Sequence, residues 1–450
     1  MSRLRILVLA PEANPEATSA PLVGYSHAEA LARIHDVTLV VRANNSKAVR
    51  SKGASFRAIQ AISMPWLDKL FAWSFRRIFR NNFHSQALTV FTYPFSVAFE
   101  WHAWQQMKRR ISAAEFDLVL RLMPITAVLP SAMAFFLRNG PIPFVIGPLN
   151  GGLPWPEGFS QVAEQKEWIS SLRNVYRFLP FARSTYRDAA AIMVASSHTY
   201  AEFIQYREKL FFVPENAVNQ SVCSDVPRTS ERGSKLELIF VGGLVPCKAC
   251  DLALRAASPL LRNDLAHFSI LGDGPERSRL EELARSLGIE KAVSFHGWVS
   301  HEEALSRMRS ADVLVFPSIR EFGGGVVFEA LASGAIPVVA DFGGPGDIVY
   351  PETGYKVSLT NESDMVAQME KILNELAGNR ELLLRLRRQG MAFARERLTW
   401  DAKAQTTTQV LQWALARGPK PDLLPPKLPV PGIDSPGQKR QALHQTSASG

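Results

Sequence analysis

The sequence has few cysteines, and its apolar stretches are short. Three cysteines in 450 residues are too few for a disulfide framework and are typical of a reducing compartment. The best uncharged apolar stretch, residues 122–137, contains Pro124 and Pro130 and is shorter than a membrane-spanning helix requires. The apolar run at residues 6–10 is too short for the core of a secretory signal. We therefore expect a cytoplasmic protein.

Internal repeats and metal-ligand patterns are also missing. None of the nine histidines has the spacing of a metal site, so no metal is expected. The net charge of +9 favours anionic partners, namely phosphorylated substrates, nucleic acid or acidic lipid. Because the positive charge is spread along the chain and no nucleic-acid recognition motif is found, nucleic acid is the least favoured of these partners.

Short apolar runs alternate with helical patterns over most of the chain. The expected strands of the first half are residues 5–9, 37–41, 118–121, 144–146 and 191–195. Those of the second half are residues 236–241, 267–271, 293–296, 313–317 and 336–340. Such alternation is typical of α/β proteins with parallel sheets that helices cover on both faces. Two series of this kind predict two doubly wound, Rossmann-like domains.

Composition shifts suggest where the domains end. Residues 223–234 are polar and rich in helix and strand breakers, which predicts a linker between domains at residues 1–222 and 235–395. A long helical region at residues 362–416 closes the fold, and we expect residues 396–416 to pack back on the first domain. Residues 417–450 are rich in proline and serine and are predicted to be a disordered tail.

A glycine cluster follows the expected strand at residues 313–317. Gly323, Gly324 and Gly325 precede a helical pattern that opens near Val326. Glycine permits close approach of the backbone, and a helix N-terminus offers free N–H groups and partial positive charge. Together these features predict a diphosphate site. The alternative is an ordinary strand–turn–helix corner.

Two carboxylates flank the glycines, and their spacing is specific. Glu321 and Glu329, with seven residues between them, resemble the E-x7-E motif of family-4 retaining glycosyltransferases. The resemblance is strong over residues 238–349 and weaker over the first 220 residues. The segments that resemble the family are SIREFGGGVVFEALASGAIP (318–337), FVGGLVPCKACD (240–251), LGDGPER (271–277), FHGWVSHEE (295–303), VPEN (213–216) and GPLNGGLPWP (147–156).

The resemblance implies a GT-B fold, in which the first domain binds the acceptor and the second binds a nucleotide-diphosphate sugar. It implies that Glu329 binds the ribose hydroxyls and that Glu321 contacts the transferred sugar. Backbone N–H groups around Gly324 and Val326 would hold the diphosphate, and Lys248 would neutralise it. We therefore expect Glu321 and Lys248 to be catalytic. Further expected donor-binding residues are Gly243, Gly272, His296, Gly323 and Gly325.

One position departs from the family pattern. The family usually has arginine where this chain has Gly243, so one diphosphate contact is absent or another cation replaces it. Arg320 is a candidate replacement, although it reads equally well as a surface arginine.

Fewer residues of the expected acceptor-binding domain resemble the family than residues of the expected donor-binding domain. The family has a glycine-rich loop where residues 11–25 lie, but this chain has only Gly24 there. The candidates for the acceptor side and the cleft between the domains are Gly24, Asn150, Gly151 and Gly152. A histidine that many family members place in this region is absent, and Asn150 is a candidate to donate a hydrogen bond there.

Residues 65–80, PWLDKLFAWSFRRIFR, combine an apolar helical face with basic residues on the other side. This pattern predicts an interfacial helix on an anionic membrane, and its alternative is a helix packed on the first domain. The residues expected to contact the membrane are Trp66, Lys69, Phe71, Trp73, Arg76, Arg77 and Arg80.

Cys247 and Cys250 form a C-x-x-C pair beside Lys248. Such thiols can be redox-active or bind a metal, but Cys223 is the remaining cysteine, and zinc needs four ligands. A plain loop is therefore the favoured interpretation.

The function expected from these observations is a retaining, metal-independent hexosyltransferase. It would move a sugar from a nucleotide sugar, used as co-substrate with no further cofactor, to a hydroxyl of a bacterial polysaccharide or lipid-linked glycan. Two alternatives remain open. One is a nucleotide-sugar epimerase on the same fold, and the other is a degenerate, non-catalytic scaffold at the membrane.

Overall fold

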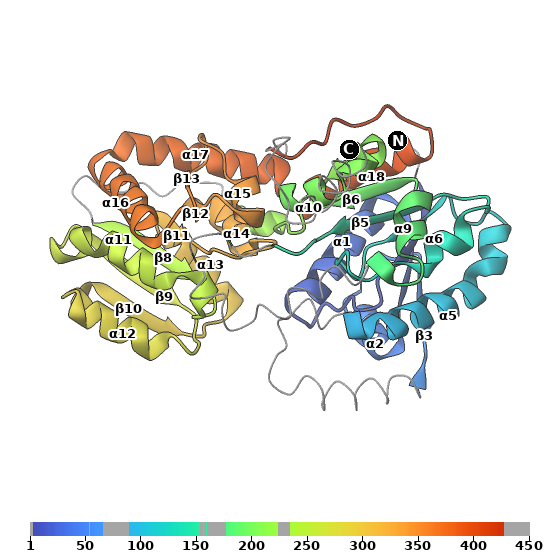
Figure 1. Ribbon diagram of the computed structural model, residues 1–450, viewed down its shortest axis with the longest axis horizontal. Helices are drawn as coiled ribbons and strands as arrows, with labels where there is room; N and C mark the ends of the chain where they lie inside the picture. The colour runs from blue at the N-terminus through green and yellow to red at the C-terminus, as the bar shows by residue number, and fades with distance from the viewer. Residues whose placement is uncertain are drawn as a thin grey trace, which may run out of the picture.

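The computed structural model describes residues 3–53, 55–65, 90–153, 156, 159, 177–223 and 235–426. They form two α/β domains side by side, each with a parallel sheet between layers of helices (Figure 1). This arrangement confirms the predicted fold class.

The first domain has a seven-stranded parallel sheet. Its strands are β1 (Arg5–Leu9), β2 (Asp36–Arg42), β3 (Ala58–Ile62), β4 (Leu118–Arg121), β5 (Phe144–Leu149), β6 (Ala191–Val194) and β7 (Leu210–Phe212). They lie in the order β3-β2-β1-β4-β5-β6-β7. The described helices are α1 (Ala20–Ile34), α2 (Ala43–Ser51), α5 (Tyr93–Ser112), α6 (Ala132–Leu137), α9 (Ala182–Asp188) and α10 (Ser197–Glu202), with short 3-10 turns η1 (Val90–Thr92), η3 (Ile204–Lys209) and η4 (Gln220–Val222).

Strand β1 shows why this sheet is buried on both faces. Ile6 and Val8 belong to one hydrophobic cluster, whereas Leu7 and Leu9 belong to another. Successive side chains of a strand point to opposite faces, so an uninterrupted apolar run fills two cores at once.

The second domain repeats the design with six parallel strands. Its strands are β8 (Leu236–Val241), β9 (Ala266–Leu271), β10 (Val293–Gly297), β11 (Val313–Phe316), β12 (Ile336–Ala340) and β13 (Tyr355–Val357), in the order β10-β9-β8-β11-β12-β13. Its helices are α11 (Cys250–Arg262), α12 (Arg277–Ser286), α13 (His301–Ser310), α14 (Gly325–Ser333), α15 (Gly343–Ile348), α16 (Glu362–Gly378) and α17 (Arg380–Arg397), with 3-10 turns η5 (Pro246–Lys248) and η6 (Glu290–Ala292).

The last described helix, α18 (Trp400–Ala414), returns to the first domain and packs on α1. Nε2 of His27 lies 2.9 Å from Oγ1 of Thr407, and Nε2 of His35 lies 2.8 Å from Oγ1 of Thr408. These buried pairs fix the helix against the domain from which it is most distant in sequence.

The domains also contact each other through α10 and α15. The carboxylate of Asp347 accepts hydrogen bonds from the backbone N–H of Ser197, at 2.7 Å, and from its hydroxyl, at 2.5 Å. Beside this contact, the ring of His198 meets that of Phe342 edge-on, with centroids 4.6 Å apart.

The C-terminal segment differs from the sequence prediction over its first residues. A disordered tail was expected from residue 417, but residues 417–426 lie along the first domain. The carbonyl of Leu423 accepts a hydrogen bond from the backbone N–H of Phe212 at 2.8 Å, and Lys420 lies over the rings of Phe211 and Trp413. The free edge of β7 thereby gains a partner.

The expected membrane-binding helix lies outside the described residues, apart from Pro65. The residues concerned are Trp66, Lys69, Phe71, Trp73, Arg76, Arg77 and Arg80. Most of the expected linker, residues 224–234, and of the expected tail, residues 427–450, also lie outside them. Among the helices that the structure describes, none combines the length and apolar character needed to cross a membrane.

Candidate functional site

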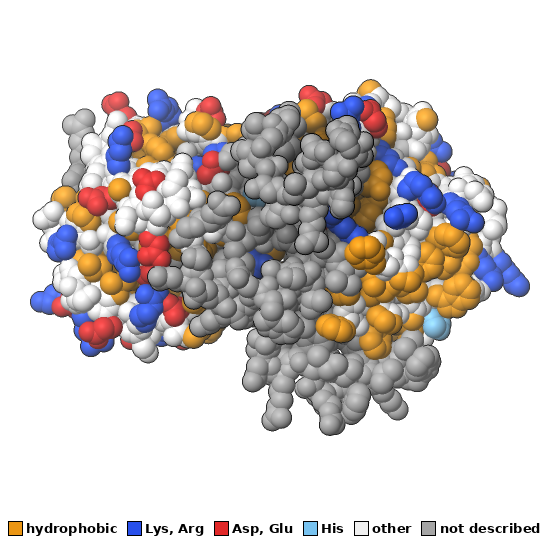
Figure 2. Space-filling model, in the orientation of Figure 1, with side chains coloured by type: hydrophobic (Ala, Val, Ile, Leu, Met, Phe, Trp, Pro, Cys, Tyr) orange, Lys and Arg blue, Asp and Glu red, His pale blue; other side chains and the backbone are white. Residues whose placement is uncertain are grey.

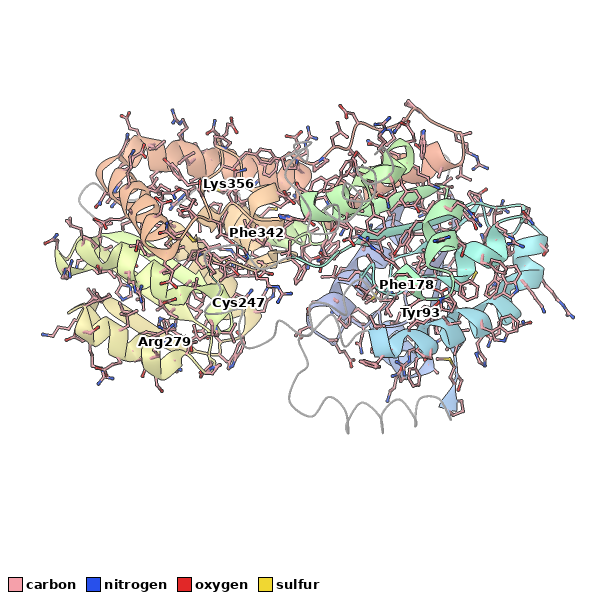
Figure 3. All side chains as sticks on the ribbon, in the orientation of Figure 1. Tyr93, Phe178, Cys247, Arg279, Phe342 and Lys356 are labelled. Carbon is pink, nitrogen blue, oxygen red and sulfur yellow. The ribbon has the colours of Figure 1, made fainter. Side chains whose placement is uncertain are left out.

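The candidate site lies at the carboxyl ends of the strands of the second sheet, where loops from β8, β9, β10 and β11 converge. This is the edge at which doubly wound sheets bind ligands, because chain directions diverge there and leave a crevice. Cys247 and Phe342 lie on the side of the second domain that faces the first (Figure 3).

The glycine turn leads directly into α14. Gly324 is its N-cap and has φ of 58°, a left-handed conformation that glycine adopts without strain. A Cβ on Gly324 would lie 2.9 Å from Cγ of Pro345, so there is also no room for a side chain. Gly325 begins the helix and Val326 follows in its first turn. The first-turn N–H groups and the helix dipole give this point the partial positive charge that suits a phosphate.

Glu321 connects the glycine turn to Lys248. Its Oε1 accepts a hydrogen bond from the backbone N–H of Gly324 at 3.3 Å, and its Oε2 forms an ion pair with Nζ of Lys248. Lys248 ends the 3-10 turn after β8, and its ammonium lies 5.1 Å from the ring centroid of Phe316. Residues 73 positions apart in sequence thus meet at one point.

Glu329 lies one turn into α14 and contacts a residue that the sequence did not single out. Its Oε1 lies 2.8 Å from Nε2 of His301, the first residue of α13. The hydrogen bond to Glu329 raises the pKa of His301 above its usual value. The imidazole therefore orients the carboxylate that was expected to bind ribose.

His296 occupies β10, near the expected position of the donor base. Its Nε2 lies 3.2 Å from the guanidinium of Arg307, and burial together with that positive neighbour lowers its pKa. His296 thus packs against Arg307 of α13 at the edge of the expected donor site.

Gly272 and Gly243 differ in how much space surrounds them. Gly272 has φ of 138°, and a Cβ there would lie 1.9 Å from the carbonyl oxygen of Gly242. At Gly243, in contrast, a Cβ would have Asp273 O, 4.0 Å away, as its nearest neighbour. The position that departs from the family pattern is therefore open. Arg320, its suggested replacement, lies over the ring of Phe322 at 5.9 Å.

On the first domain, the structure brings Asn150 and Gly151 to the cleft. Asn150 follows β5, and its backbone N–H donates to the carbonyl of Ile125. Gly151 donates its N–H to Oγ1 of Thr199 at 2.8 Å, and a Cβ there would lie 2.7 Å from the carboxylate of Glu202.

Gly152 follows in the same loop, and Leu153 then reaches the second domain. A Cβ on Gly343 would lie 2.9 Å from Cδ1 of Leu153. The loop expected to line the cleft therefore does meet the opposite domain.

The structure gives Gly24 a different setting from the one that the family resemblance suggested. It lies inside α1 instead of in a loop, and a Cβ there would lie 2.1 Å from Sδ of Met123. Gly24 thus serves the packing of α1 against the segment after β4. One glycine in an otherwise helical pattern gave no means of telling these roles apart.

Two first-domain residues that the sequence did not assign to the site lie against the glycine turn. A Cβ on Gly323 would lie 2.3 Å from Nδ2 of Asn216 and 3.2 Å from Cδ of Glu215. Both residues belong to the quoted VPEN segment, which was the available signal. The turn is therefore enclosed between the two domains.

The cysteine pair shows no sign of reactivity. Cys247 and Cys250 are free thiols, and burial raises the pKa of both above the usual value. Thiolates are the reactive form, so this environment disfavours redox chemistry and metal binding. Within the described part of the chain, no group of three or more His, Cys, Asp or Glu side chains has an arrangement that could hold a metal.

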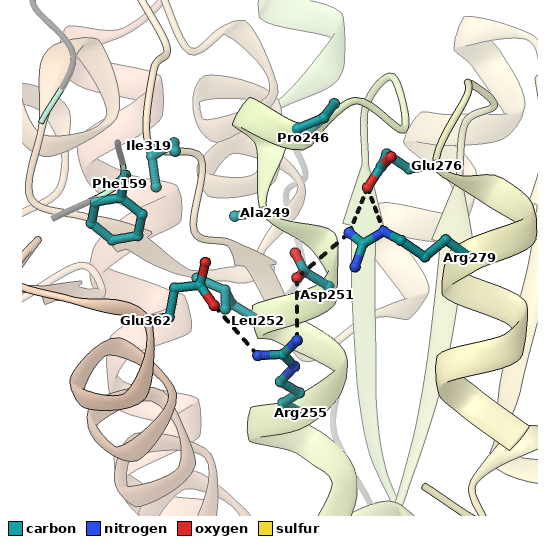
Figure 4. Close-up of a pocket in the computed structure, with 10 residues that line it drawn as sticks. All are labelled: Phe159, Pro246, Ala249, Asp251, Leu252, Arg255, Glu276, Arg279, Ile319 and Glu362. Carbon is teal, nitrogen blue, oxygen red and sulfur yellow. Dashed lines mark hydrogen bonds and ion pairs between the residues drawn. The ribbon is translucent and has the colours of Figure 1, made fainter. Parts of the chain in front are cut away.

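A separate cavity of about 390 Å³ adjoins the same loop (Figure 4). Arg279 pairs with Asp251 and Glu276, and Arg255 pairs with Asp251 and Glu362. Carboxylates of the cavity wall thus pair with both arginines. The glycine turn differs from this cavity because it offers the backbone N–H groups of a helix N-terminus beside its paired cation.

Comparisons with known proteins agree with this geometry. Residues 225–390 match the family model of glycosyl transferases group 1. The chain is 31% identical over 179 residues to an uncharacterized glycosyltransferase of Methanocaldococcus jannaschii, which is 40% of this chain and 45% of that protein. It is 34% identical over 189 residues to a D-inositol 3-phosphate glycosyltransferase of Streptomyces griseus, which is 40% of this chain and 39% of that protein. The matches thus span less than half the length of either relative.

Among solved structures, Anabaena HepE in complex with UDP superposes with a TM-score of 0.60 at 16% identity, covering 91% of this chain and all of that one. At this identity the likeness concerns the fold alone, and it extends over both domains. The described chain thus has the GT-B fold, and its second domain carries the sequence pattern of glycosyl transferases group 1.

Proposed function

We propose that this protein is a glycosyltransferase that transfers a sugar from a nucleotide-diphosphate sugar to an acceptor hydroxyl with retention at the anomeric carbon. The observation that carries the proposal is the meeting of Lys248, Glu321 and the glycine turn of α14 at the interdomain cleft, with Glu329 one turn further on. The family resemblance of residues 225–390 and the E-x7-E spacing support it.

In the proposed reaction, the acceptor oxygen attacks the anomeric carbon from the side on which the diphosphate leaves. The new carbon–oxygen bond forms as the bond to the diphosphate breaks, and the hydroxyl proton passes to an oxygen of the departing phosphate. The protein contributes position and charge stabilisation of the leaving group. Lys248 and the N-terminus of α14 supply that positive charge, so we propose a reaction that needs no metal.

For the nucleobase we propose a first candidate to test, and for the acceptor we propose a chemical class. UDP is the first nucleotide to test, because the structure of HepE contains it. A bacterial polysaccharide or lipid-linked glycan is the acceptor class that we propose, since it would suit a basic enzyme at the cytoplasmic face of a membrane.

Exposed aromatic residues on the first domain support peripheral membrane contact. Phe91, Trp101, Phe135 and Phe178 are exposed, and hydrophobic side chains gather on this face near α5 and α6 (Figure 2). Arg138 lies over the ring of Phe135 at 4.2 Å, which adds a cation to the aromatic surface. Binding to phosphatidylglycerol vesicles but not to phosphatidylcholine vesicles at low salt would support this contact, and equal absence of binding to both would contradict it.

The test of donor binding is a calorimetric titration with UDP, GDP and ADP. We expect one nucleotide to bind, and Glu329→Ala to weaken it about 10- to 100-fold, because a charged hydrogen-bond acceptor contributes about 1.5–3 kcal/mol. Glu282→Ala, an exposed glutamate on α12 of the same domain, is the matched control and should bind normally.

Three results would count against the proposal. Binding of no nucleotide would refute it. Epimerised free nucleotide sugar without transfer would favour the epimerase, and nucleotide binding equal in Glu329→Ala and wild type would favour the scaffold.

A further inference from the structure

Asn150 and Glu215 form a polar pair in the first domain, at the cleft. Nδ2 of Asn150 donates a hydrogen bond to Oε2 of Glu215. Asn150 is 5% exposed, whereas Glu215 is partly exposed. The backbone of Asn150 is held at both ends, because its N–H donates to Ile125 and its carbonyl accepts from Ala127 at 3.3 Å. These two backbone hydrogen bonds therefore fix the position from which the Asn150 side chain extends.

The pairing leaves one polar atom without a partner. A carboxylate can only accept hydrogen bonds, so the amide of Asn150 must present its nitrogen to Glu215. Its Oδ1 is buried and has no hydrogen-bond partner among the residues that the structure describes. An unsatisfied buried carbonyl is unfavourable, and a hydrogen-bond donor from a ligand would remove that penalty.

The pair lies beside the expected point of sugar transfer. Cδ of Glu215 is 3.2 Å from the position that a Cβ on Gly323 would take. Burial raises the pKa of Glu215, the hydrogen bond from Asn150 and the charge of Lys403 oppose this effect, and the charge of Glu321 adds to it. Because Oε1 of Glu321 accepts from the N–H of Gly324, the glycine turn has one carboxylate beside it from each domain.

The buried side chain of Lys403, on α18, contacts the backbone of Glu215. Its ammonium donates to the backbone carbonyl of Glu215 and lies 5.0 Å from the ring centroid of Trp400. Through this contact the C-terminal helix fixes the segment after β7, on which Glu215 lies. The carboxylate is therefore pre-positioned before any substrate arrives.

We propose that Glu215 and Asn150 form a binding site for a carbohydrate hydroxyl at the point of transfer. The carboxylate of Glu215 accepts a hydrogen bond from the hydroxyl, and Oδ1 of Asn150 accepts another from the same or a neighbouring hydroxyl. The inference rests on the proposed glycosyltransferase function and adds a substrate contact from the first domain. The hydroxyl belongs either to the acceptor or to the transferred sugar, which share this chemistry.

The experiment compares wild type, Glu215→Gln, Asn150→Ala and the control Glu208→Gln, whose side chain is 85% exposed. The affinities of UDP and UDP-glucose, or of the matching pair for the base selected by titration, are measured by calorimetry. The rate of UDP release from UDP-glucose is measured in water and with hexyl glucoside as an acceptor probe. Circular dichroism and melting temperature establish that each variant is folded.

We expect Glu215→Gln and Asn150→Ala to bind UDP as wild type does and to release UDP at least 10-fold more slowly. If the hydroxyl belongs to the transferred sugar, the affinity for UDP-glucose falls relative to that for UDP. If it belongs to the acceptor, both affinities are unchanged, and the acceptor-dependent rate falls. Asn150→Ala serves as the second test if Glu215→Gln does not fold.

Unchanged affinities and unchanged release rates in both folded variants would overturn the inference while leaving the proposed function intact. Failure of wild type to bind any nucleoside diphosphate would refute the proposed function, and this inference with it.

Discussion

Replacing Lys403 with methionine should change how the stability of the protein depends on pH. Lys403 is 5% exposed, and burial lowers the pKa of its ammonium to about 7, although the charge of Glu215 opposes that effect. Between pH 7 and the unfolded value of 10.5, the unfolded chain carries a proton that the folded chain does not. The free energy of unfolding of wild type therefore rises with pH across this window.

The size of the effect follows from these two pKa values. The linkage relation gives wild type about 2.5 kcal/mol more stability at pH 9 than at pH 6 from this one group. Methionine has a similar length and cannot titrate, so Lys403→Met lacks this increment. The variant also loses the hydrogen bond to the carbonyl of Glu215, but that loss is a nearly constant offset and leaves the slope unaffected.

Urea denaturation of both proteins at several pH values between 6 and 9 measures the difference. We expect Lys403→Met to gain stability relative to wild type as the pH falls. Lys371→Met, which removes an exposed lysine from α16, should follow wild type at every pH. Curves for Lys403→Met and wild type that stay parallel from pH 6 to 9 would refute the reasoning, because they would mean that Lys403 keeps its proton when buried.

Three further predictions concern single residues. Gly243→Arg should fold normally, since among the described residues beyond its chain neighbours the atom nearest to its Cβ is Asp273 O at 4.0 Å. It should bind nucleoside diphosphate more tightly in calorimetry, and weaker binding would contradict the assignment of this loop. Glu100→Gln should lower the unfolding free energy by about 3–5 kcal/mol in urea, because it leaves the buried guanidinium of Arg121 without its ion partner. His301→Ala should lower the melting temperature more at pH 6 than at pH 8, since the raised pKa of His301 makes its contact with Glu329 strongest when protonated; an equal loss at both values would show that charge does not matter there.

Many of the strands that the sequence predicted have largely apolar runs, such as β1 and β12. Such runs can be recognised in the sequence because both faces of a strand in a parallel sheet are buried. Strands β3, β7 and β13 were not predicted. They lie at sheet edges, and they are short or only partly buried, so neither length nor hydrophobicity marks them.

The helical region at residues 362–416 shows that helix boundaries were predicted less well than the presence of helices. It was predicted as one region, and the structure divides it into α16, α17 and α18. The breaks occur at Asn379 and Thr399, whose side chains accept hydrogen bonds from the backbone N–H groups of Leu382 and Ala402. Such N-caps are readable from sequence in principle, because Asn and Thr are favoured there.

The candidate site likewise contains some residues that the sequence suggested and others that it did not. Lys248, Glu321 and Glu329 could be proposed from the sequence because their segments resemble the donor motifs of the family and follow predicted strands. Glu215 and Lys403 could not, because their meeting depends on α18 crossing back to the first domain. No local pattern in the sequence distinguishes a solvated glutamate from one that faces another domain.

The position of the Glu321 carboxylate bears on how a donor diphosphate would bind. This carboxylate accepts a hydrogen bond at the N-terminus of α14 and pairs with Lys248, at the point where a phosphate is expected to bind. A diphosphate that binds there as proposed would exchange with this carboxylate. That exchange would release Glu321 toward the sugar as the donor arrives, and Lys248 would have an anionic partner both before and after that step.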